Sequence, residues 1–177
     1  VTTVVGISMF IGLGLCIGGM LFMEPLLTAF GASEAVLPQA KEYAFWMFVA
    51  ALANLPAQSM NCAARAESSV RISSVAVITG AVLNVVLDPV FMFDWGLGLG
   101  VGGASLATTV SQFVTFLILA WFYLCGHSMI KIKRAYFRPD WKLVKEVTLI
   151  GIPTAVIQIC LAVATSLTNI AAKPMAD

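Results

Sequence analysis

About five long apolar segments dominate this chain and restrict what it can fold into. Each is long enough for a helix that crosses a membrane, and a backbone inside lipid must satisfy its own hydrogen bonds, which favours helices. Because 60% of the residues are hydrophobic and only 11% are charged, against about a quarter in soluble domains, we predict an all-α polytopic membrane protein. The spans are expected at residues 4–30, 38–66, 72–93, 104–126 and 147–172.

The longest polar stretch, residues 127–146, predicts a boundary between two groups of helices. We assign residues 1–126 to a first lobe, 127–146 to a loop between lobes, and 147–177 to the first helix of a second lobe. The chain starts at Val1 within an apolar segment and ends just after a helix. We therefore expect a fragment of a longer transporter-like chain, whose partners are the remainder of that transporter and the lipid bilayer.

Lysine and arginine are concentrated in two places, which predicts the orientation of the chain. Eight of the ten Lys and Arg residues lie in or beside residues 65–71 and 127–146, and short cytoplasmic loops are enriched in these residues. We therefore expect a multi-pass protein of the cell membrane with both of these loops in the cytoplasm. The net charge of +1 gives no sign of a nucleic-acid partner.

The first span is rich in glycine. Gly14 and Gly18 form a GxxxG pair, which is typical of membrane helices that approach each other closely. Because the motif is common in any helix bundle, it indicates a packed helix and little more.

A carboxylate within an apolar segment, Asp88 in LNVVLDPVF at residues 83–91, is the main candidate for a functional group. A charge at membrane depth costs at least about 2.5 kcal/mol, so it normally faces a protein interior or a wet cavity. Asn84 lies one turn earlier on the same helical face. Two interpretations stay open for this pair: a proton or cation site, or hydrogen bonding between helices.

Other polar side chains recur at helical spacing in the remaining apolar segments. They predict either the wall of a central cavity or hydrogen bonds between helices. Thr108 or Thr109 is expected near Asp88, because a short loop joins their spans. The candidate cavity residues are Asn54, Gln58, Asn61, Gln112 and Gln158.

The sequence offers no set of residues suited to catalysis or to metal binding. Its four cysteines fall in different apolar segments and its single histidine lies in a basic loop. One acid in an apolar span, without a paired base or nucleophile, is not a catalytic constellation. We therefore expect neither an enzyme nor a resident cofactor.

Several motifs resemble the multidrug and toxic compound extrusion (MATE) transporters. LNVVLDPVF (83–91) and GLGLGVGGASLAT (96–108) look like the fifth and sixth helices of that family, NCAARAESSVR (61–71) like the end of the fourth, and GIPTAVIQ (151–158) like the start of the seventh. The resemblance implies helices three to seven of a twelve-helix, two-lobe antiporter. The sequence departs at Glu67-Ser-Ser69, where the family usually has a glycine after the acid.

The resemblance is to the branch of this family that carries an Asp on the fifth helix. It implies that Asn84, Asp88 and Thr108 belong to a cation or proton site, with H+ or Na+ as the coupling ion. The implied function is secondary-active efflux of small organic cations or amphipathic drugs, for which this fragment alone is expected to be inactive. Two alternatives are a flippase for lipid-linked precursors, from a related superfamily, and a non-transporting membrane subunit.

Overall fold

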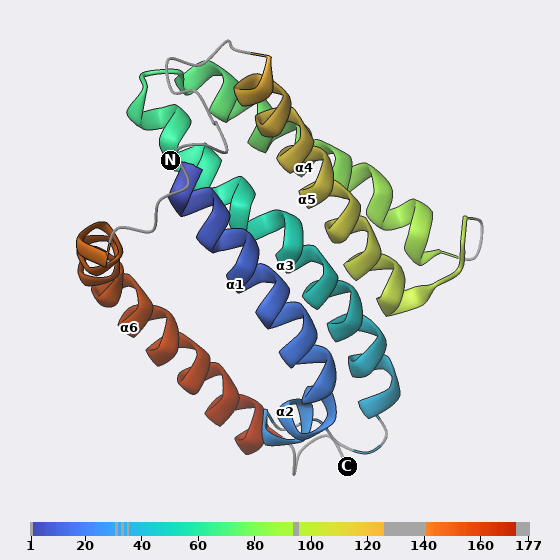
Figure 1. Cartoon of the computed structure of the whole chain (residues 1–177). Coiled ribbons are helices and arrows are strands. Elements are labelled where there is room, and N and C mark those ends of the chain that lie inside the picture. Colours follow the sequence, from blue (N-terminus) through green and yellow to red (C-terminus); the bar gives the residue numbers. More distant parts are fainter. Residues whose placement is uncertain are drawn as a thin grey trace.

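The structure is built from helices throughout the part of the chain that it describes (Figure 1). The computed structural model describes residues 2–30, 32, 34, 36–93, 96–125 and 141–172. Its helices are α1 (Thr2–Leu21), α2 (Met23–Ala29), α3 (Leu37–Ala66), α4 (Val70–Met92), α5 (Gly100–Leu124) and α6 (Trp141–Ala172). The predicted all-α polytopic fold is confirmed, because α1, α4, α5 and Gly151–Thr168 of α6 are long and apolar enough to cross a membrane.

The four long helices α1, α3, α4 and α5 pack as a bundle (Figure 1). Extensive contacts join α3 to α1 on one side and to α5 on the other, and α5 in turn packs along α4. Among the described residues, α6 makes no packing contact with these helices. The polar groups of α3 therefore have protein neighbours, which explains how a less apolar helix belongs to the same bundle.

The first predicted span is interrupted, so the expectation of a single helix over residues 4–30 was wrong. α1 ends at Leu21, and α2 starts at Met23 after a bend at Phe22. Pro25 explains the break, because a proline has no backbone N–H and its ring clashes with the carbonyl four residues earlier, here that of Leu21. The other spans begin and end within a few residues of the predictions, except that α6 already begins at Trp141. Of the predicted inter-lobe loop, residues 127–140 lie outside the described part of the chain.

Close packing of α1 against α3 occurs at Gly12 and Gly19, and not at the GxxxG pair Gly14 and Gly18. A side chain at Gly12 would meet the Ala51 carbonyl oxygen at 3.1 Å, and one at Gly19 would collide with the ring of Phe48. Gly14 and Gly18 have open space beside them among the described residues. The GxxxG motif indicated a packed helix, and α1 does pack against α3, but the close contacts are made at Gly12 and Gly19.

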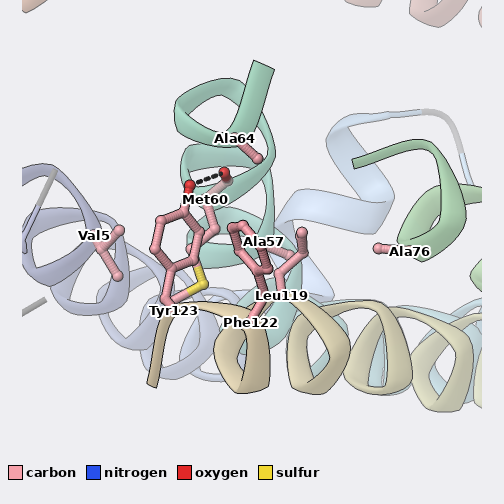
Figure 2. Packing of buried hydrophobic residues seen from close by; sticks show 8 residues of the cluster. All are labelled: Val5, Ala57, Met60, Ala64, Ala76, Leu119, Phe122 and Tyr123. Carbon is pink, nitrogen blue, oxygen red and sulfur yellow. Dashed lines mark hydrogen bonds between the residues drawn. The ribbon is translucent and has the colours of Figure 1, made fainter. Parts of the chain in front are cut away.

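A compact apolar cluster holds the bundle together at the end where α3 connects to α4 (Figure 2). Leu119 and Phe122 of α5 pack against small residues of α3 and α4, including Ala64 and Ala76. The Tyr123 hydroxyl donates a hydrogen bond to the Met60 carbonyl oxygen at 3.1 Å. At this end of the bundle, α5 is therefore joined to α3 by both apolar packing and a hydrogen bond.

Candidate functional site

Three predicted residues form one hydrogen-bonded cluster between α4 and α5. The Asn84 amide nitrogen Nδ2 lies 3.3 Å from Asp88 Oδ1 and 3.2 Å from Thr108 Oγ1. The Thr108 hydroxyl donates its own hydrogen to the Ala104 carbonyl at 3.0 Å, so its oxygen is free to accept from Asn84. Asn84 therefore connects the carboxylate of α4 to the hydroxyl of α5.

A cavity of about 210 Å³ lies between α3, α4 and α5, next to this cluster. Amide and hydroxyl side chains form much of its wall. Asn84 and Thr108 contribute from the cluster, whereas Asp88 lies one turn beyond the lining residues of α4. The predicted residues on the wall are Asn54, Gln58, Asn61, Asn84, Thr108 and Gln112.

The packing of three helices explains why a cavity exists here. α3 and α5 pack closely, as do α4 and α5, but α3 and α4 contact each other little. The link between α3 and α4 is only three residues long, from Glu67 to Ser69, so these two helices are held together at that end. The cavity occupies the space between them over the surface of α5.

A side-chain hydrogen bond joins α3 to α4 between the cavity and the α3–α4 link. Ser73 on the first turns of α4 donates a hydrogen bond to Asn61 Oδ1 on α3, and both side chains are buried. Thr115 of α5 lies against Gly80, where an added side chain would collide with its hydroxyl oxygen. The polar wall therefore extends from the Asp88 end of α4 toward the hydrogen bond between Ser73 and Asn61.

Ser111 and Thr115 are cavity-lining residues that the sequence analysis missed. Both hydroxyls are buried and bond to carbonyls of their own helix, at 2.8 and 2.9 Å respectively. Serine and threonine in membrane helices make such local bonds wherever they face, so their presence alone is a weak signal. Their spacing from Thr108 and Gln112, which places all four on one side of α5, was the available clue.

Gln158 is the one predicted cavity residue that the structure places elsewhere. It lies on α6, with an exposed side chain. Because no described residue of α6 packs against α3, α4 or α5, Gln158 does not contribute to this cavity.

Comparison with known proteins identifies the family of the chain. The MatE family model matches residues 1–90, slightly more than half of the 177 residues. The chain belongs to the MatE family. As a member it is a multi-pass protein of the cell membrane, in agreement with the apolar helices described above.

Curated MatE relatives are much longer than this chain. The FAD transporter of Shewanella oneidensis is 29% identical over 126 residues, which cover 69% of this chain and 27% of the relative. The multidrug export protein MepA of Staphylococcus aureus is 25% identical over 149 residues, covering 84% of this chain and 33% of the relative. The chain thus spans about a quarter to a third of these relatives.

Solved MATE structures share the fold of this chain. An inward-facing conformation of a multidrug resistance MATE family transporter of the MOP superfamily superposes with a TM-score of 0.83 at 27% identity, covering 92% of this chain and 37% of that one. A MATE structure in the bent conformation gives a TM-score of 0.81, also at 27% identity, and covers 90% and 36% of the two chains.

Proposed function

We propose that this chain is part of a secondary-active efflux antiporter, which exchanges H+ or Na+ for amphipathic or cationic organic compounds. The observation that carries the proposal is the Asp88–Asn84–Thr108 cluster at one end of a polar cavity. The names of the relatives, which describe multidrug export and FAD transport, support transport rather than catalysis. Because the matched segments cover only 27% and 33% of those relatives, the transporter is proposed to include the remainder of the parent chain.

The chemistry of the cluster suits a small cation. A carboxylate, an amide and a hydroxyl supply the oxygen atoms that Na+ prefers, and a carboxylate also takes up a proton directly. Asp88 Oδ1 accepts a hydrogen bond from Asn84, so an arriving proton or Na+ competes with that amide. Loading the site would therefore alter the hydrogen bond through which Asn84 joins α4 to Thr108 of α5.

This mechanism gives a direct role to the charge of Asp88. We expect Asp88→Asn in the full-length transporter to abolish gradient-driven efflux. The neutral amide neither takes up a proton nor carries the negative charge that attracts Na+. The test uses inverted membrane vesicles, a fluorescent cationic dye, and an imposed pH gradient or Na+ gradient. The proposal is supported if one of the two gradients drives dye movement in the wild type but not in the Asp88→Asn variant. The gradient that drives the movement identifies the coupling ion.

Two results would contradict the assignment. Normal efflux by Asp88→Asn would remove Asp88 from the coupling step. A well-inserted wild type that moves no dye under either gradient would favour the alternative of a lipid-linked precursor flippase or a non-transporting subunit, and Asp88 would then serve helix packing.

A second substrate, FAD, is suggested by the relative from Shewanella oneidensis. FAD carries phosphate groups, and the described residues that line the cavity include no lysine or arginine to bind them. We therefore expect FAD to compete weakly with a cationic dye for the transporter. Strong competition by FAD, measured in the same vesicles, would contradict the expectation that the transporter prefers the cationic dye.

A further inference from the structure

Two consecutive threonines of α5 form hydrogen bonds to two different helices. Thr108 accepts a hydrogen bond from Asn84 of α4 at 3.2 Å. The Thr109 hydroxyl is buried and lies 2.8 Å from the Trp46 carbonyl oxygen of α3 and 2.8 Å from the Ser105 carbonyl oxygen of its own helix. Neighbouring residues of α5 are therefore bonded to both of the helices that enclose the cavity with it.

The Thr109 hydroxyl has one hydrogen for two acceptor oxygens. It can donate to α3, to its own helix, or to both through a three-centre bond. The bond to the Ser105 carbonyl satisfies the hydroxyl by itself, as is usual for threonine in membrane helices. The bond to the Trp46 carbonyl is therefore not needed to bury the hydroxyl, and it depends on how α5 is placed against α3.

Thr108 and Thr109 move together because they are consecutive residues of one helix. A small rotation or shift of α5 that changes the distance from Thr108 to Asn84 also changes the distance from Thr109 to the Trp46 carbonyl. Near the end of α5, the Tyr123 hydroxyl bonds to another carbonyl oxygen of α3 at 3.1 Å. At that end α5 therefore stays joined to α3 when the contact at Thr109 lengthens.

The arrangement with the bond from Thr109 to Trp46 is also the one in which Asn84 engages the carboxylate of Asp88. Asp88 Oδ1 accepts a hydrogen bond from the Asn84 amide at 3.3 Å, and a proton or Na+ competes with that amide for the same oxygen. A contact that stabilises this arrangement weakens the binding of the ion to Asp88, because a conformation that competes with a ligand lowers the apparent affinity for it.

We propose that Thr109 is a positioning residue for the Asp88 site, whose hydrogen bond to the Trp46 carbonyl holds α5 against α3 and opposes loading of Asp88 by the coupling ion. This inference rests on the proposed function, because it concerns the same ion site. Loading of Asp88 lengthens the contact at Thr109. The wall of the cavity that α3 contributes therefore moves relative to α5 when the charge of Asp88 is neutralised.

The other charged groups on the helices that pack around Asp88 lie toward the helix ends. α5 contains no Asp, Glu, Lys, Arg or His. In α3, Lys41 pairs with a glutamate of α2, Glu42 lies against the first turn of α5, and Arg65 lies in the last turn. α4 carries Arg71 near its start. Substitutions at Thr109 leave all of these groups unchanged, so an altered proton affinity of Asp88 reports on the contact between α5 and α3.

The experiment measures protonation of Asp88 in the purified full-length transporter in detergent. Dicyclohexylcarbodiimide modifies protonated carboxyl groups in apolar surroundings, and fragmentation mass spectrometry quantifies the product at Asp88 as a function of pH. We expect Thr109→Val, which keeps the shape of the side chain, to reach half-maximal labelling at about fivefold lower proton concentration than the wild type. Thr109→Ser, which retains a hydroxyl, should behave as the wild type does.

The choice of variants controls for folding and for loss of a hydroxyl as such. In Thr109→Val the Trp46 carbonyl keeps the hydrogen bond of its own helix, so this variant should remain folded and monodisperse. Ser105→Ala is the matched control, because it removes a buried hydroxyl of α5 that bonds to the Gly102 carbonyl of the same helix. It should keep the wild-type proton concentration. Looser packing alone gives no reason for tighter proton binding, so the direction of the change identifies the mechanism.

Labelling of Asp88 separates this inference from the function that it builds on. An unchanged or higher proton concentration in Thr109→Val, or an equal decrease in Ser105→Ala, would overturn the role of Thr109 even if efflux is intact. A wild type in which labelling of Asp88 does not depend on pH would overturn it too, because Thr109 would then have no loading step to oppose. The expected decrease in a transporter without gradient-driven efflux would overturn the antiport proposal and leave the link between Thr109 and Asp88 in place.

Discussion

Ser68 carries a backbone conformation that serine rarely adopts. α3 ends in a Schellman motif, in which the backbone N–H of Ser69 bonds to the Ala64 carbonyl and that of Ser68 to the Arg65 carbonyl. The motif requires a left-handed residue, and Ser68 supplies it with a φ of 62°. This is the position after Glu67, where the resemblance to the family led us to expect glycine.

We therefore expect Ser68→Gly to stabilise the protein by about 1 kcal/mol, because glycine adopts the left-handed region without steric cost. Thermal unfolding of the purified transporter in detergent would show the gain as a higher melting temperature. Ser69→Gly is the matched control. Its φ is −84°, so glycine brings only extra flexibility there, and an equal gain in both variants would refute the explanation.

Thr108 tests the hydrogen bond between α4 and α5 at the level of one atom. Thr108→Val keeps the shape of the side chain but removes the oxygen that accepts from Asn84 at 3.2 Å. We expect a loss of about 0.5–1.5 kcal/mol in stability and a much larger loss of ion-driven efflux. Thr79→Val on the exposed face of α4 should change neither quantity; unaltered coupling in Thr108→Val would remove Thr108 from the ion site.

Among the helices, α4 and α5 approach each other closely at Gly80, as they also do at Gly103. A side chain at Gly80 would collide with Thr115 Oγ1 and come within 3.3 Å of the Ser111 carbonyl oxygen. The short helix–helix distance lets Thr115 reach the Ala76 carbonyl at 3.4 Å. The cavity wall is therefore sensitive to the volume of this residue.

Gly80→Ala is expected to lower the melting temperature, because the added methyl group pushes α5 away from α4. Adding Thr115→Ala removes the closest colliding atom and should restore part of the loss, which a double-mutant cycle would measure as a favourable coupling energy. Gly14→Ala, where open space surrounds the residue, should be neutral or slightly stabilising. Purely additive effects of Gly80→Ala and Thr115→Ala would show that the two residues do not collide.

The elements themselves were largely predictable, because apolar length and polar spacing are properties of single helices. Four of the five expected spans correspond to α3, α4, α5 and α6. The sequence signal for the break at Phe22 is Pro25, three residues later, which disrupts the preceding helical turn. The choice of Gly12 over Gly14 for contact with α3 depends on how α1 is rotated, which the sequence of one helix does not determine.

At the scale of the whole molecule, the distribution of lysine and arginine predicts that the C-terminal ends of α3 and α5 face the cytoplasm. Cys125, exposed directly after α5, reports on that side. A membrane-impermeant thiol reagent should label it in inverted vesicles and leave it unlabelled in right-side-out cells. Cys16, buried against the bundle, should stay unlabelled in both, and labelling of Cys125 from outside would reverse the predicted orientation.

The candidate site was predictable in its members but not in its shape. Helical spacing brought Asn84 and Asp88 together, and the short connection between their spans placed Thr108 nearby. The cavity itself arises because α3 and α4 are joined at one end and contact each other little, which is a tertiary property. For the same reason, the position of Gln158 away from the cavity and the hydrogen bond from Thr109 to α3 could be seen only in three dimensions.

The three helices that enclose the cavity follow one another along the chain, from Leu37 to Leu124. All the described residues that line the cavity belong to this continuous stretch, so its assembly requires only short loop closures. During synthesis, the pocket can form in the membrane as soon as α5 has left the insertion machinery, before any later helix is made. Biogenesis and quality control of the parent transporter can thus begin from a preassembled unit with its polar groups already shielded from lipid.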